Sequence, residues 1–194
     1  MENILSKKPQ EICKEILELI DNKDVKVEVN SDEKSSLYVF LNNTIYISCN
    51  EKKSKDKEKS ERSKLLVMAH ECRHSIQNRV VQMLNFILSN LEIVLFVALL
   101  VMKVMFKVNL KYVAFLYFLI AICSIFIRLF LELDAVINSV KIVTRYLFKN
   151  NVDKVKTQNL QKYYKKEIMK TLPVFILWLF LFKIIRLMII VGIV

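Results

Sequence analysis

Residues 112–133 read YVAFLYFLIAICSIFIRLFLEL, a run in which Arg128 and Glu132 are the only charged side chains. About 20 apolar residues in a helix are enough to cross the hydrocarbon core of a bilayer. Two further apolar runs lie on either side of this one, at 93–108 and 172–194. We therefore predict a mainly α-helical membrane protein with three transmembrane helices.

The rest of the chain divides by composition around these runs. Residues 91–133 are expected to form a transmembrane hairpin, and 172–194 a C-terminal transmembrane helix. Between them, residues 134–171 are polar, contain 9 basic and 3 acidic side chains, and are expected to be helical. Basic segments favour the cytoplasmic side of a membrane, so we predict a multi-pass cell-membrane protein with 64–90 and 134–171 in the cytoplasm. Nucleic acid is not an expected partner, because no basic motif interleaved with aromatic residues is present.

Residues 1–63 are mixed and polar, and are expected to lie outside the membrane. Residues 9–21 have the apolar spacing of an amphipathic helix. Three β-rich segments predict a small antiparallel sheet: 25–29, 37–41 and 44–48. Asn42 and Asn43 join the last two segments, and asparagine tolerates the positive φ that a tight hairpin needs. Residues 50–63 are almost entirely charged or Ser, which is typical of a solvated connector.

The cysteines of the chain are far apart and form no CxxC pair: Cys13, Cys49, Cys72 and Cys123. This spacing does not favour a disulfide framework or a structural zinc ribbon. It is the pattern expected in a reducing compartment.

The only two histidines, His70 and His74, lie within 64–90, the first part of a helical segment expected to reach about Phe106. Residues i and i+4 share one face of a helix, so both imidazoles can reach a single metal ion. Glu71 lies about 100° around the helix from His70, where it can reach a water held by that ion. This is the HExxH arrangement of zinc metallopeptidases, with Glu71 as general base. The alternative is an accidental surface pair, but apolar residues precede the motif, and unpaired histidine in a buried helix is costly.

A catalytic zinc usually takes three protein ligands and leaves one position for water. The third ligand must be Glu, Asp or Cys, because no third histidine exists. Cys72 would point to the opposite face of the helix, and Glu92 would lie about 27 Å beyond His74. The hairpin returns Glu132 and Asp134 toward the HExxH helix. We therefore favour Glu132 as ligand and Asp134 as the partner of a histidine N–H, although the two roles could be exchanged.

Residues 70–77 and 132–135 carry two short motifs, His-Glu-Cys-Arg-His-Ser-Ile-Gln and Glu-Leu-Asp-Ala. The first resembles the His-Glu-Val-Gly-His-Ala-Ile-Gln motif of the YugP-like membrane zinc metallopeptidases, and the second resembles their Glu-Phe-Asp-Ala motif. The order of motif, two spans, acidic motif, polar helix and final span is also similar, over about residues 37–194. Cys72 and Arg73 replace the Val-Gly of the family.

The resemblance implies a zincin-like HExxH helix and a neutral zinc peptidase, with Glu71 as base and three zinc ligands: His70, His74 and Glu132. We therefore predict a membrane-bound endopeptidase that hydrolyses peptide or protein substrates. The alternative is a non-catalytic metal-binding membrane protein that acts through partner binding. An endopeptidase could hold its substrate as an extra strand beside 44–48, with Asn43, Thr44 and Tyr46 in the cleft. A hairpin that only covers the helix is the equal alternative.

Lys183 and Arg186 lie one turn apart within the C-terminal apolar run. They could pair with carboxylates inside the helix bundle, or extend to a membrane interface. The sequence favours the interface slightly, because long basic side chains commonly extend to the polar headgroups.

Overall fold

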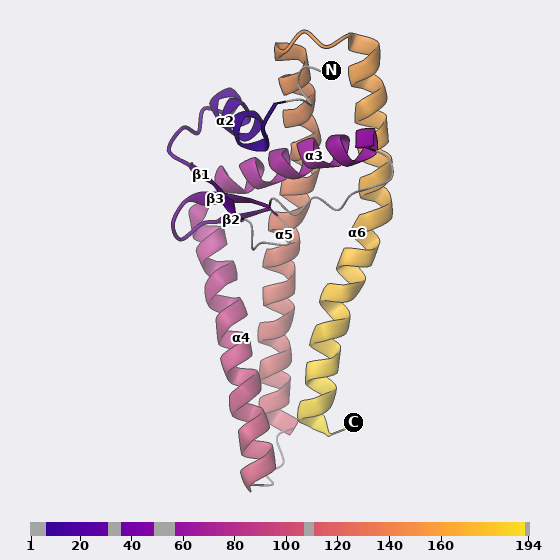
Figure 1. The fold of residues 1–194 in the computed structure, drawn as a ribbon. Coiled ribbons are helices and arrows are strands. Elements are labelled where there is room, and N and C mark those ends of the chain that lie inside the picture. The colour runs from indigo at the N-terminus through magenta and orange to yellow at the C-terminus, as the bar shows by residue number, and fades with distance from the viewer. Residues whose placement is uncertain (1–6, 31–35, 49–56, 107–110, 193–194) are drawn as a thin grey trace. The chain divides into compact units, whose positions relative to one another are not determined.

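The four longest elements of the protein are helices. The computed structural model describes residues 7–30, 36–48, 57–106 and 111–192. These residues belong to two units, whose elements are labelled in Figure 1. The first unit joins residues 1–77 and 133–168, and the second joins 78–132 and 169–194. The described residues are mostly helical, with one small sheet, which confirms the prediction of a mainly α-helical protein.

The first unit contains α2 (Pro9–Leu19), whose proline occupies the first turn, where a missing N–H does no harm. The buried side chains of α2 follow helical spacing: Ile12, Cys13, Ile16 and Leu17. The helix ends two residues before the predicted end, because Asp21 adopts a positive φ of 56°. The N–H of Asn22 then bonds the carbonyl of Leu17 at 2.9 Å, which satisfies a carbonyl of the last turn.

The sheet of this unit contains β1 (Lys26–Asn30), β2 (Leu37–Val39) and β3 (Thr44–Ser48). β3 lies in the middle, antiparallel to β2 and parallel to β1. The prediction of an antiparallel sheet is therefore wrong for one of the two pairs. β1 and β2 form the two edges of the sheet. β3, the last strand in the sequence, lies between them and runs parallel to β1.

The core of the first unit is built around α3 (Lys57–Ser75), the helix that carries the HExxH motif. Residues of α3 at helical spacing are fully buried: Leu65, Met68, Ala69 and Cys72. They form one cluster with Ile45 of β3 and with Tyr146 and Tyr164. The tyrosine hydroxyls find partners, at 2.6 Å on Glu15 and at 2.7 Å on the carbonyl of Arg62. This packing fixes the face that α3 turns away from the core.

The charged connector predicted for 50–63 lies partly outside the described residues. Residues 57–63 form the first turns of α3. α3 ends at Ser75, and α4 (Arg79–Phe106) begins four residues later, whereas the sequence predicted one continuous helix. Asn78 explains the break, because its Oδ1 accepts the N–H of Val80 at 2.8 Å and caps the new helix.

α5 (Lys111–Lys149) and α6 (Lys154–Val191) are joined by a short turn in which Asn151 adopts a φ of 55°. Asp153 caps α6, since its Oδ2 accepts the N–H groups of Val155 and Lys156. The basic segment 134–171 is therefore helical on both sides of the turn, as the sequence predicted.

Three helices are long and apolar enough to cross a membrane: Arg79–Phe106, Tyr112–Lys149 and Lys154–Val191. The sequence predicted three such helices, and their presence is compatible with a membrane protein. A helix of 38 residues is about 57 Å long, whereas a bilayer core is about 30 Å thick. Only part of α5 can therefore lie in hydrocarbon, and its apolar run ends at Leu133.

In the second unit, α4 turns polar side chains inward and apolar side chains outward. Gln82, Asn85, Ser89 and Glu92 follow one another at spacings of three, four and three residues, which places them on one helix face. Gln82 and Glu92 are buried, whereas large apolar residues of α4 such as Val94 and Met105 are exposed. This distribution is expected where the exposed surface faces lipid.

Glu92 is 0% exposed and accepts bonds from three side chains of the second unit. Its Oε1 accepts from Arg186 and from the Tyr117 hydroxyl, both at 3.2 Å, and its Oε2 accepts from Lys183. The Arg186 guanidinium also lies 5.6 Å from the centre of the Phe96 ring. Lys183 and Arg186 thus pair with a carboxylate of the bundle, the reading that the sequence slightly disfavoured.

Candidate metal centre

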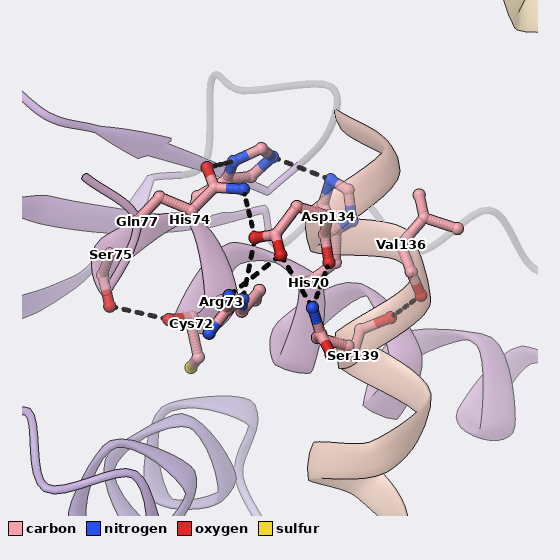
Figure 2. Close-up of polar contacts among 10 residues, drawn as sticks. His70, Cys72, Arg73, His74, Ser75, Gln77, Asp134, Val136 and Ser139 are labelled. Carbon is pink, nitrogen blue, oxygen red and sulfur yellow. Dashed lines mark hydrogen bonds and ion pairs between the residues drawn. The ribbon is translucent and has the colours of Figure 1, made fainter. Parts of the chain in front are cut away.

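The two imidazoles of α3 meet at their Nε2 atoms. His70 and His74 are one turn apart, and their Nε2 atoms lie 3.0 Å from each other (Figure 2). The rings are perpendicular, with their centres 4.5 Å apart. Both residues are half-buried, because the opposite face of α3 packs in the core. The expectation that both side chains can reach one point is therefore met in the geometry.

A carboxylate of α5 completes a group that could hold a metal ion. Ligand atoms of His70, His74 and Glu132 all lie within 4.8 Å of one another. Glu132 immediately precedes Leu133 in the continuous helix α5, so the helix holds it close to Asp134. Ligands at about 2.0–2.1 Å from a tetrahedral ion stand roughly 3.3 Å apart. The imidazole nitrogens, 3.0 Å apart, are close to this spacing.

Asp134 lies beside the histidine pair and is held by three side chains. Arg73 binds it through two bonds of 2.9 Å, Nε to Oδ2 and Nη2 to Oδ1. Gln77 donates to Oδ2 at 2.9 Å, and Asn138 donates to Oδ1 at 2.7 Å. Burial alone would raise the pKa of Asp134, but the bonds from Arg73 and Gln77 outweigh it and hold this pKa below its ordinary value.

The sequence assigned Asp134 to a histidine N–H, and the structure connects the two through Gln77. Oε1 of Gln77 lies 2.8 Å from Nδ1 of His74, and its Nε2 donates to Asp134 (Figure 2). Sequence reasoning did not single out Gln77. The available signal was its position three residues after His74, just beyond the end of α3.

Glu71, the expected general base, is 8% exposed and reaches the sheet. Its Oε2 accepts the backbone N–H of Tyr38 in β2 at 2.7 Å. β2 is an edge strand, so this N–H points away from β3 and toward α3. The structure therefore places Glu71 next to His70 in the chain and against the sheet edge that faces the helix.

The residues expected to bind substrate lie in and before β3. Asn43 has a φ of 52°, which confirms the Asn42–Asn43 turn, and its Oδ1 accepts the Tyr38 hydroxyl at 2.8 Å. Thr44 is 2% exposed, and the Tyr46 hydroxyl accepts from Asn42 at 2.9 Å. Because β3 is flanked on both sides, an added strand would have to pair with β1 or β2 instead.

Cys72 and Arg73, the two residues between Glu71 and His74, face in different directions. Cys72 is fully buried, with its Sγ 3.5 Å from Sγ of Cys13 in α2. Burial, and then the contact with Cys13, raises the pKa of the Cys72 thiol well above its ordinary value. A protonated thiol is a poor metal ligand, which agrees with the expectation that Cys72 points away from the site. Arg73 instead reaches across to Asp134 (Figure 2).

In comparisons with known proteins, no family model, no curated protein and no solved structure matches the chain. The resemblance to the YugP-like metallopeptidases therefore rests on the two short motifs and their order, and it stays a prediction.

Proposed function

We propose that the protein is a zinc-dependent peptidase of the membrane, related to the YugP-like metallopeptidases. The observation that carries the proposal is the histidine pair with Nε2 atoms 3.0 Å apart and a carboxylate from α5 within 4.8 Å. Two histidines and one glutamate are the ligand set of zinc in a class of peptidases. Three protein ligands leave a position for water, which hydrolysis requires.

The residues of the site divide the work of hydrolysis between them. His70, His74 and Glu132 would hold the ion. Bound zinc would polarise the scissile carbonyl and lower the pKa of a water molecule. The Glu71 carboxylate would take a proton from that water and deliver it to the leaving amine. Glu71 is buried, and the bond from the Tyr38 N–H holds its carboxylate beside the edge of β2.

The edge of β2 supports a peptide as substrate. An extended peptide can add to a sheet edge through main-chain hydrogen bonds, whatever its sequence. The Tyr38 N–H is the backbone donor of β2 beside Glu71, so it could exchange this carboxylate for a substrate carbonyl. The substrate would then pair with β2. Asn43, Thr44 and Tyr46 lie in and before the central strand β3, so they would stabilise this edge without contacting the substrate.

The three helices that are long and apolar enough to cross a membrane support a membrane location for this chemistry. We propose that the histidine pair and the basic residues of 134–171 face the cytoplasm, because basic segments favour that side. Peptides or proteins at the cytoplasmic face of a cell membrane would be the substrates.

The test is cleavage of casein, or of the protein itself, by the full chain in detergent micelles. Glu71→Gln should leave zinc bound and lower the cleavage rate at least about 10²-fold, the usual effect of losing a general base. Glu18→Gln is the matched control, because Glu18 is an exposed residue of α2. Cleavage by Glu71→Gln at the wild-type rate would refute the proposed mechanism.

A non-catalytic metal-binding protein is the second candidate, and the bond between Glu71 and the Tyr38 N–H favours it. In that case the carboxylate would tie α3 to the sheet and need not act on water. Zinc-loaded wild-type protein that cleaves neither casein nor itself, with or without a chelator, would support this candidate over the peptidase.

A further inference from the structure

Donors on neighbouring side chains fix the orientation of the Asp134 carboxylate. Arg73 donates one N–H to each of its carboxylate oxygens, and Asn138 donates a third. Arginine has donor groups only, so both oxygens of Asp134 must accept from it. The carboxylate of Asp134 therefore acts as an acceptor toward every group around it.

This fixes the orientation of the Gln77 amide. The amide nitrogen and oxygen of glutamine have nearly the same shape, so their placement must follow from the neighbouring groups. Only the nitrogen can donate to Asp134, which it does at 2.9 Å, so the oxygen must face Nδ1 of His74 at 2.8 Å. Gln77 is 8% exposed, which keeps competing water away from both bonds.

The orientation of Gln77 in turn fixes the tautomer of His74. A carbonyl oxygen can only accept, so Nδ1 of His74 must carry a hydrogen. In a neutral imidazole the other nitrogen is then unprotonated. That nitrogen, Nε2, lies 3.0 Å from Nε2 of His70 and within the group that includes Glu132.

We propose that Gln77 is a positioning residue of the metal centre, which transmits the donor–acceptor order of Arg73 and Asp134 to His74 and keeps the Nε2 lone pair available for the ion. The inference rests on the proposed metal site, but it concerns the metal-free protein as well. Arg73 stands where the resembled family has glycine, and its two bonds orient Asp134. The chain of bonds runs from Arg73 to Asp134, then to Gln77 and His74. Because it begins at Arg73, this chain of bonds depends on a residue that the family motif lacks.

The metal-free protein offers a direct test, because it contains only two histidines. The full chain would be labelled with ¹⁵N-histidine in detergent micelles and its imidazole nitrogens recorded by NMR, with His70→Gln to assign the signals. We expect His74 to carry its hydrogen on Nδ1 in the wild type, and to become a mixture of tautomers in Gln77→Leu. A wild-type His74 protonated on Nε2 would overturn the proposal, whether or not any variant folds.

Zinc affinity, measured by competition with a fluorescent chelator, gives the second readout. Loss of a hydrogen-bond partner of a ligand histidine weakens metal binding by about 10–100-fold, so Gln77→Leu should bind zinc that much more weakly. Gln158→Leu, at an exposed site of α6, should bind like the wild type.

The outcomes separate this inference from the proposed function. Tight zinc binding by Gln77→Leu with an unchanged tautomer would overturn the positioning role and leave the metal site intact. The expected tautomer in a wild type that binds no zinc would overturn the metal site and leave the chain of bonds intact.

Discussion

Replacing Glu92 with Gln tests whether the charge of this carboxylate stabilises the second unit. Glu92 is 0% exposed and contacts Lys183, Arg186 and Tyr117 through its two oxygens. Glutamine keeps the length of the side chain and one acceptor oxygen, so the substitution changes the charge more than the shape. Two cations of α6 are then left beside a neutral side chain in an apolar bundle.

The magnitude follows from the burial of the three charges. Removing one partner of a buried ion pair costs about 3–5 kcal/mol, because the other charge is left uncompensated. The Lys183 and Arg186 side chains are 19% and 33% exposed, so solvent or headgroups screen part of their charge. We therefore expect Glu92→Gln to lower the free energy of unfolding by the smaller of these amounts, about 3 kcal/mol.

The assay is reversible unfolding of the full chain by SDS in mixed micelles, followed by circular dichroism. Glu92→Gln combined with Lys183→Met removes one of the two unpaired cations, so its loss should be smaller than the sum of the two single losses. A Glu92→Gln protein within about 0.5 kcal/mol of the wild type, the range of ordinary surface substitutions, would refute the reasoning. The two cations would then be solvated at an interface instead.

Three further predictions concern the first unit and its boundary. Asn78→Ala should lower the free energy of unfolding by about 1 kcal/mol, because α4 loses its cap; an unchanged denaturation midpoint would show that the break at 76–78 does not depend on Asn78. Burial alone would raise the pKa of Glu15, but hydrogen bonds from Lys7 and Tyr146 hold it below its ordinary value. Glu15 therefore stabilises the fold above about pH 4.3, the ordinary glutamate pKa, and this contribution is lost as the pH falls through the lower folded pKa. Thermal unfolding of Glu15→Gln against pH should lack that acid-side loss, and a wild-type-like profile would contradict the assignment. Free zinc at 100 times its dissociation constant should stabilise the wild type by about 2.7 kcal/mol, and His74→Ala should abolish the shift in melting temperature.

Local patterns in the sequence were enough to predict the helices and the histidine pair. The three apolar runs have the length of membrane spans, and the i, i+4 spacing of His70 and His74 requires only that α3 be helical. Glu132 could be proposed as the third member of the group because a hairpin of two apolar runs was expected to return the chain toward the histidines.

Side-chain partners and strand order could not be predicted in this way. Nothing in the segment 26–48 shows that β3 inserts between the other two strands, because strand order depends on long-range pairing. The capping role of Asn78 was hidden by a helical pattern that continues on both sides of it. Gln77 became significant only when α5 brought Asp134 beside it.

Glu92 shows the same limit within the second unit. Sequence reasoning considered Glu92 only as a metal ligand and set it aside because of its distance from His74. Its polar neighbours on the same face of α4, Gln82, Asn85 and Ser89, were the signal that this face is turned inward. Pairing with Lys183 and Arg186 would have followed from the cost of burying a carboxylate alone.

X-ray absorption at the zinc edge of the purified full chain measures whether His70, His74 and Glu132 hold one ion. We predict one zinc per chain with a shell of nitrogen and oxygen atoms at about 2.0–2.1 Å, including two imidazoles. It also predicts that Glu132→Ala loses the carboxylate oxygen from this shell. A sulfur neighbour at about 2.3 Å, or a protein that retains no zinc, would contradict the account.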